Sequence, residues 1–120
     1  MTTNRNPEEL LPLTPAVFHI LLALIDTERH GYAIMADVAA QTDGQVRMGP
    51  GTLYGSIKRM IAADLIAEAD ERPAPNLDDE RRRYYRLTPF GRSVAAAESR
   101  RLVKLLSVAR GKGLTRPSFA

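Results

Sequence analysis

The chain has 120 residues, an apolar fraction of 44% and a charged fraction of 26%, as expected for one globular domain with a single core. It contains no cysteine, which excludes disulfides, thiolate metal sites and a thiol nucleophile. The longest apolar stretch, residues 16–25, is too short to span a bilayer. The residues before it are polar and contain prolines, so we expect no signal peptide and a cytoplasmic protein.

The net charge of +3 is unevenly distributed along the chain. Residues 1–80 carry six basic and thirteen acidic side chains, whereas residues 81–120 carry eleven basic and one acidic. This asymmetry indicates either an anionic partner for part of the surface or a solvated basic helix. Charge alone does not separate these two interpretations.

The first helix is predicted at "LTPAVF", where Thr14 is the N-cap and Pro15 the first helical residue. The apolar residues that follow have helical spacing and form two adjacent stripes, so this helix needs a cover on more than one side. In so small a protein, a second copy of the chain is a candidate for that cover. A second helix is predicted over residues 32–42, after Gly31, and the alternating segment "QVRM" at 45–48 predicts a very short strand.

The stretch "MGPGTLYGSIKRM", residues 48–60, predicts a third helix with Gly49 as its cap and Pro50 as its first residue. Its inward face repeats apolar residues, and its outer surface changes from small side chains to cations. Between residues 44 and 63 there are three basic side chains and no acidic one. Glycine costs a helix interior about 1 kcal/mol relative to alanine. The glycines therefore indicate that another backbone, such as that of a nucleic acid, approaches this helix closely.

A β-hairpin and a long helix complete the predicted elements. The segments "LIAEAD" and "RYYRLT" predict two strands that are joined by a long exposed tip over residues 71–82. Thr88 and Pro89 repeat the cap signal and begin a helix that extends to about Arg110. The fold is thus expected to be mainly α with a small β-hairpin: a winged helix-turn-helix plus a C-terminal helix.

Four segments of the chain resemble the PadR family of bacterial transcriptional regulators. They are "HGYAIMADV" at 30–38, "GPGTLYGSIKRM" at 49–60, "DLIAEAD" at 64–70 and "RRRYYRLTPFGR" at 81–92. The chain departs from the family at Gly55, where proline is usual, and at Gly49, where serine or threonine is usual. The single C-terminal helix resembles the short subclass of the family.

The resemblance implies a homodimeric repressor that binds an inverted-repeat operator in double-stranded DNA. It places the third helix in the major groove, the wing near the adjacent backbone and the two C-terminal helices against each other. The chain would then divide into a flexible arm at 1–12, the winged helix-turn-helix at 13–87, the dimerisation helix at 88–110 and a tail at 111–120. A small-molecule effector of unknown identity is a further implied partner, although the absence of tryptophan leaves an aromatic-stacking site unsupported.

The candidate DNA-contacting residues come mainly from the third helix and the wing. The start of a helix presents unpaired N–H groups and a positive dipole end to phosphate, while hydroxyl groups and cations reach phosphates or base edges. On the wing, arginines are expected along phosphates or in a minor groove, unless the acidic residues 78–80 neutralise them. The predicted contacts are Tyr32, Arg47, Gly51, Thr52, Tyr54, Gly55, Ser56, Lys58, Arg59, Arg82 and Arg83.

The candidate dimer interface combines the apolar stripes of the first and last helices. It comprises Val17, Phe18, Leu21, Leu24, Val94, Leu102, Leu105, Leu106 and Ala109. Cations at positions such as Arg100 and Lys104 keep another side of the last helix in water, which favours a dimer core over a membrane helix.

Two other classes of function remain as alternatives. The first is a winged-helix adaptor whose third helix binds an acidic protein without sequence-specific DNA binding. The second and weaker one is an enzyme, because the sequence has no nucleophile–base pair, metal-ligand spacing or phosphate-loop signature. Two histidines without a cysteine or a carboxylate cluster support no metal site. We therefore expect no catalytic residue and no cofactor.

Overall fold

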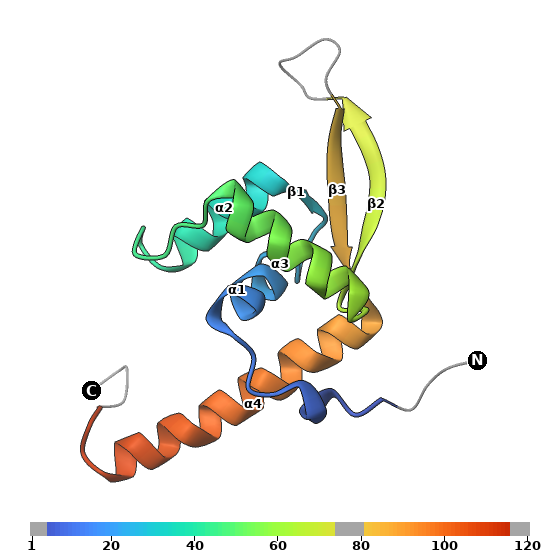
Figure 1. The fold of residues 1–120 in the computed structure, drawn as a ribbon. Coiled ribbons are helices and arrows are strands. Elements are labelled where there is room, and N and C mark those ends of the chain that lie inside the picture. Colours follow the sequence, from blue (N-terminus) through green and yellow to red (C-terminus); the bar gives the residue numbers. More distant parts are fainter. Residues whose placement is uncertain (1–4, 74–80, 116–120) are drawn as a thin grey trace.

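The computed structural model describes residues 5–73 and 81–115 and contains a helical body from which a β-hairpin projects (Figure 1). The body consists of α1 (Pro15–Ala23), α2 (Gly31–Gln41) and α3 (Pro50–Ala62), and a short 3-10 helix, η1 (Pro7–Leu10), precedes it. The hairpin consists of β2 (Ile66–Pro73) and β3 (Arg81–Leu87), and α4 (Pro89–Gly111) follows. The predicted class, mainly α with a small sheet and a C-terminal helix, is confirmed.

Local capping chemistry sets the starts of the three long helices that begin with proline. Thr14 Oγ1 accepts a hydrogen bond from the Val17 N–H at 3.3 Å, and Thr88 Oγ1 accepts one from the Gly91 N–H at 2.9 Å. Gly49 caps α3 without a side-chain hydrogen bond. Proline at the first helical position needs no partner for its nitrogen, so all three starts were readable from the sequence.

The core lies where α1, α2, α3, the base of the hairpin and the first half of α4 meet. Its largest fully buried apolar side chains are Ile20, Leu21, Ile34, Val38, Leu53, Met60, Ile66 and Val94. This packing fixes α3 on one side of the body and leaves its opposite face in solvent. It also brings the base of the wing against α3.

The third strand of the sheet is β1 (Arg29–His30), which pairs with β3 in the strand order β1-β3-β2. The predicted strand over residues 45–48 is therefore wrong. The Val46 N–H donates to Thr42 Oγ1 at 2.9 Å, so this segment closes the turn after α2 and has no strand as a partner. Val46 and Met48 alternate because they pack against the edge of the core.

The predicted hairpin tip over 71–82 is too long. The β2–β3 ladder continues past an irregularity between Glu68 and Glu71, and it pairs Glu71 with Arg83 and Pro73 with Arg81. Pro73 lies on an edge strand of the sheet, where proline is tolerated. The acidic residues 78–80, the alternative partners of the wing arginines, lie outside the described residues.

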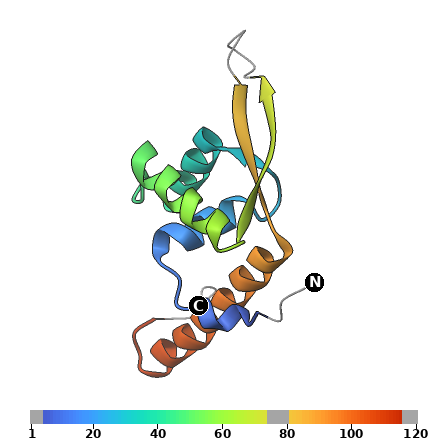
Figure 2. The same ribbon diagram turned by 45° about the vertical axis from the view of Figure 1, so that its right-hand side comes forward.

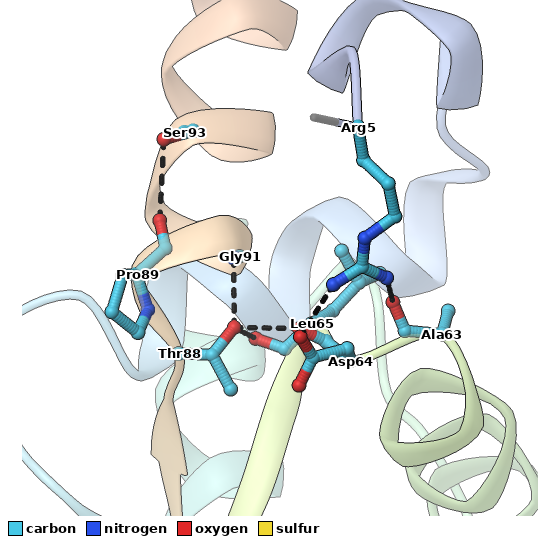
Figure 3. A network of polar contacts seen from close by, with 8 residues as sticks. All are labelled: Arg5, Ala63, Asp64, Leu65, Thr88, Pro89, Gly91 and Ser93. Carbon is cyan, nitrogen blue, oxygen red and sulfur yellow. Dashed lines mark hydrogen bonds and ion pairs between the residues drawn. The ribbon is translucent and has the colours of Figure 1, made fainter. Parts of the chain in front are cut away.

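A polar junction connects the end of α3, the base of the wing and the start of α4 (Figure 3). Thr88 Oγ1 donates to the Asp64 carbonyl oxygen at 2.6 Å while it caps α4. Arg5 forms a 2.6 Å ion pair with Asp64, and its guanidinium carbon lies 4.1 Å from the centroid of the Phe90 ring. The N-terminal segment is thereby bound at the corner where α3 leads into the wing.

The second half of α4 extends beyond the helical body, on the far side from the hairpin (Figures 1 and 2). Only the first half of this helix packs on α1, and η1 covers its middle. The apolar side chains of the second half of α4 therefore lie beyond the core that covers its first half.

Candidate nucleic-acid interface

The face of α3 that points away from the core carries the surface predicted to bind DNA. Gly51, Thr52, Lys58 and Arg59 are exposed, and Gly55 is half-buried. Leu53, Ile57 and Met60 are buried on the opposite face. Long cations near the end of the helix and small residues near its start thus share one accessible surface, as the helical spacing predicted.

Two glycines at the start of α3 have no internal reason to be glycine. A Cβ atom at Gly49 or Gly51 would meet no atom within 4 Å. Gly49 has a φ of −79°, which any residue adopts. The packing of the chain around these two positions would therefore accommodate a side chain.

Ser56 is corrected from a surface residue to a core residue. Its side chain is 1% exposed, and its Oγ accepts a hydrogen bond from Arg59 Nη2 at 3.4 Å. Residues three and four positions apart share a helix face, which places Ser56 with Leu53 and Met60. The buried hydroxyl of Ser56 cannot contact a ligand directly, but its hydrogen bond keeps the guanidinium of Arg59 close to the helix.

Tyr54 packs across the start of α2 and keeps part of its ring in solvent. Its hydroxyl lies so close to Gly31 that a Cβ atom there would overlap it. Gly31 is therefore required by the crossing of α2 and α3. Tyr32, the next residue, is 69% exposed, so two tyrosines flank the accessible start of α2.

Arg47 is exposed but turns back toward the preceding turn. Its Nε donates to the Gly44 carbonyl oxygen at 3.2 Å. This bond places the guanidinium beside the segment that leads into α3.

The two wing arginines lie in different surroundings. Arg82 is partly buried, and its Nη1 lies 2.8 Å from Nε2 of His30. Arg83 is exposed and forms a 3.4 Å ion pair with Glu68 on the neighbouring strand. An exposed pair at this distance stabilises the fold by only about 0–1 kcal/mol.

His30 has a structural role that sequence reasoning missed. Its Nδ1 lies 3.2 Å from the Ala33 N–H, at the position from which a side chain caps α2. Its ring also meets Tyr84 edge-on, with centroids 5.3 Å apart. Burial, and then the charge of Arg82, lower the pKa of His30 below its ordinary value. Histidine is an uncommon cap, so no local signal marked it.

The predicted dimer residues fall into two groups. Leu21, Leu24 and Val94 are buried in the core of their own chain, and their assignment to an interface is wrong. Leu102, Leu105 and Leu106 are exposed, and Val17, Phe18 and Ala109 are half-buried. Helical periodicity identifies an apolar stripe, but it does not tell which part of the stripe the chain covers itself.

Two observations on the described residues concern metal-binding proteins and membrane proteins. Within residues 5–73 and 81–115, no group of three or more histidine and carboxylate side chains is arranged to hold a metal ion. In the same part of the chain, every helix is too short or too polar to cross a bilayer.

Comparison with known proteins identifies the family. Residues 20–97 match the model of the transcriptional regulator PadR-like family. The chain is 37% identical over 86 residues to an uncharacterized 37.1 kDa protein of transposon Tn4556 from Streptomyces fradiae, and this match covers 72% of the chain but only 22% of that protein. It is 33% identical over 87 residues to the transcriptional regulator Rv3488 of Mycobacterium tuberculosis, which covers 72% of the chain and 75% of the relative.

Solved structures have the same fold. A PadR family transcription regulator from Clostridium difficile superimposes with a TM-score of 0.67 at 21% identity, covering 82% of this chain and 97% of that one. Bacillus subtilis PadR in complex with operator DNA superimposes with a TM-score of 0.61 at 17% identity, covering 72% of this chain and 46% of that one. The matched family consists of regulators rather than enzymes, and the chain belongs to this PadR-like family of transcriptional regulators.

Proposed function

We propose that this chain is a sequence-specific DNA-binding repressor that acts as a homodimer on an inverted-repeat operator. The observation that carries the proposal is the exposed face of α3. This face combines glycines whose Cβ positions are open, a hydroxyl group and two cations. Between residues 44 and 63 no carboxylate opposes these cations. A solved relative of the same fold was found with operator DNA, which supports a nucleic acid as the partner.

The first turn of α3 suits a phosphate or a base edge. Gly49 provides no side-chain oxygen to the first N–H groups of the helix, and the helix dipole adds positive potential there. Thr52 donates from its hydroxyl, and Lys58 and Arg59 extend from the following turns. An Arg or Lys contact to a guanine is worth about 1–3 kcal/mol of discrimination.

The wing supplies a second group of cations at the side of α3. Arg83 is exposed and pairs with the Glu68 carboxylate of the neighbouring strand at 3.4 Å. A phosphodiester oxygen competes well with an exposed carboxylate, because a groove backbone offers many such oxygens. Contacts of this kind fix the position of a protein on DNA without reading its sequence.

The second half of α4 supports the dimer. Val94, Ala95 and Glu98 are buried on the face that packs on the body. The same face continues at helical spacing through Leu102, Leu105 and Leu106, which the chain leaves exposed. A contiguous exposed apolar surface of this kind is typical of a protein–protein interface. We assign it to the α4 helix of a second copy.

A twofold dimer would present two α3 helices to one face of the duplex. Half-sites about 34–36 Å apart, or a multiple of that distance, would then form an inverted repeat. The decisive experiment is binding of labelled duplexes from the DNA upstream of the gene that encodes this chain, measured by fluorescence anisotropy against unlabelled random duplex. We expect one fragment to resist competition, with a salt slope of about −0.9 per neutralised phosphate.

A matched pair of variants tests whether α3 is the binding element. K58A/R59A and R110A/K112A remove the same charge, the first from α3 and the second from the end of α4. Only K58A/R59A should abolish the preference for the selected fragment. Equal binding to selected and random duplex by the unaltered protein would instead favour the acidic-protein adaptor. The protein is a repressor if it lowers transcription from that fragment in vitro and the K58A/R59A variant does not.

A further inference from the structure

His30 lies between two hydrogen-bond donors at the place where the wing meets the body. The Ala33 N–H of α2 points at Nδ1 at 3.2 Å, and the Arg82 guanidinium of β3 points at Nε2 at 2.8 Å. A neutral imidazole has one acceptor nitrogen and one N–H, and neither the guanidinium nor the backbone N–H accepts. The site therefore has one lone pair for two donors, and His30 satisfies only one of them at a time.

The surroundings of His30 contain no compensating carboxylate among the described neighbours. β1 packs against β3 and α2. From β3, Arg82 and the ring of Tyr84 face the imidazole. From α2 the facing group is the backbone N–H of Ala33, while the carboxylate of Asp37 lies 3.7 Å from Arg29. A proton on His30 would thus face another cation and a second donor.

A phosphodiester oxygen is the kind of group that this cluster needs. It is an anion that only accepts hydrogen bonds, so it can take the guanidinium of Arg82 away from the imidazole. In the tautomer in which Nε2 accepts from Arg82, Nδ1 carries the proton of the neutral ring. Departure of the guanidinium then leaves the lone pair of Nε2 free to bind a second proton from solvent, and the adjacent phosphate stabilises the resulting charge. β1, which carries His30, pairs with β3 of the wing, which carries Arg82 (Figure 1), so the cluster lies at the base of the wing contact proposed above.

We propose that His30 is a positioning residue of the DNA interface, which holds Arg82 on the wing in the free protein and releases it to a backbone phosphate as His30 takes up a proton. This inference rests on the proposed DNA binding. It makes binding proton-linked: the pKa of His30 is higher in the complex than in the free protein. Affinity therefore rises as the pH falls between those two values, by at most about tenfold per pH unit for one proton.

The coupling of His30 to Arg82 is testable without DNA. NMR titration of the whole chain should give His30 a pKa below the ordinary histidine value of about 6.5. In R82Q the pKa of His30 should rise toward the ordinary histidine value of about 6.5, because the guanidinium charge is gone. An unchanged pKa of His30 in R82Q would overturn the coupling, whatever the protein does with DNA.

The handover is tested by the affinity for the selected duplex between pH 5.5 and 8.0 at constant salt. We expect the unaltered protein to bind more tightly at the acidic end, H30Q to bind with a flat pH profile, and the control H19Q to keep the unaltered profile. A glutamine at position 30 retains an acceptor for Arg82, so its loss of pH dependence would not reflect a loss of the fold. The same slope in H30Q as in the unaltered protein overturns the handover alone. If the unaltered protein binds no duplex at any pH, the proposed function fails, and the handover fails with it.

Discussion

Gly91 packs directly against the carbonyl group of Leu65, with no room for a side chain between the start of α4 and the base of the wing (Figure 3). The Leu65 carbonyl also accepts a hydrogen bond from the Thr88 N–H at 3.1 Å. The direction of α4 is therefore fixed relative to the turn that ends α3. If α4 joins two copies, this junction sets how far apart their α3 helices lie.

We predict that G91A strongly destabilises the chain. The added methyl group would overlap backbone, which cannot turn aside as a flexible side chain can. Overpacking of this kind costs about 1–3 kcal/mol, measurable as a fall in the free energy of unfolding in urea. G111A is the matched control, because a Cβ at Gly111 meets nothing within 4 Å. Equal stability of the two variants would contradict the tight contact.

A second prediction concerns Glu98, a buried carboxylate on α4 that is 2% exposed. It pairs with Arg101 and accepts a hydrogen bond from the Leu13 N–H at 3.1 Å. The hydrogen bond from Arg101 has the largest effect and lowers the pKa of Glu98 below its ordinary value. Burial acts in the opposite direction, and the hydrogen bond from the Leu13 N–H adds to the lowering of this pKa. Its stabilising effect is therefore complete above the ordinary value of 4.5 and is lost as the pH falls through the lowered one.

The measurement for Glu98 is the free energy of unfolding between pH 3 and 7. E98Q should be less stable than the unaltered chain at pH 7, by about 1–3 kcal/mol for a charged hydrogen bond with a buried partner. The difference should narrow toward pH 3. E9Q, at an exposed residue of η1, supplies the comparison for general acid effects. A difference in unfolding free energy between E98Q and the unaltered chain that stays constant with pH would argue against a charged Glu98.

The parts of the fold that the sequence predicted correctly depend on local chemistry. Thr14-Pro15, Gly49-Pro50 and Thr88-Pro89 each start a helix, because a cap and a proline act within one turn. The two-residue strand β1 was missed because it forms only when β3, more than fifty residues further on, pairs with it. No pattern fits in two residues, so this pairing could be found only in three dimensions.

The errors at the candidate sites have a different origin. Ser56 was assigned to the surface from its polarity, although its helical position beside Leu53 and Met60 already placed it inward. Leu21 and Val94 belong to real apolar stripes, but tertiary packing covers them within the chain. Position on a helix was therefore more informative than polarity, and neither could separate the core from an interface.

We predict that G51A separates folding from DNA binding. A Cβ at Gly51 meets nothing within 4 Å, and alanine favours a helix over glycine by up to about 1 kcal/mol. The variant should unfold at an equal or higher temperature. If DNA approaches this turn closely, the methyl group should raise Kd for the selected duplex by roughly fivefold or more, which corresponds to the lower end of an overpacking cost of about 1–3 kcal/mol. Unchanged affinity with G51A would exclude a close approach at this turn.

K58A should weaken DNA binding through a cation that the fold does not use. Lys58 is exposed on α3, so its removal should leave the unfolding temperature unchanged. Affinity should fall by about 1–3 kcal/mol if Lys58 reads a base edge, whereas a phosphate contact would reduce the salt slope by about 0.9 for every sequence. K112A, just beyond α4, is the matched control. If K58A binds DNA as tightly as K112A and the unaltered protein do, Lys58 does not belong to the interface.

The last prediction tests the assignment of the exposed half of α4 to a second copy. Leu105 is 55% exposed in the single chain, so L105E should leave its helical circular dichroism unchanged. In a dimer the same change buries an unpaired carboxylate in an apolar contact, at a cost of several kcal/mol. Sedimentation velocity should therefore show a dimer for the unaltered protein and a monomer for L105E, and the monomer should lose affinity for a duplex with two half-sites more than for one with a single half-site. L114E, an exposed leucine beyond the helix, should remain dimeric. Sedimentation of L105E as a dimer would place the interface elsewhere on the chain, and the spacing that Gly91 and Leu65 impose would then no longer determine the separation of the half-sites.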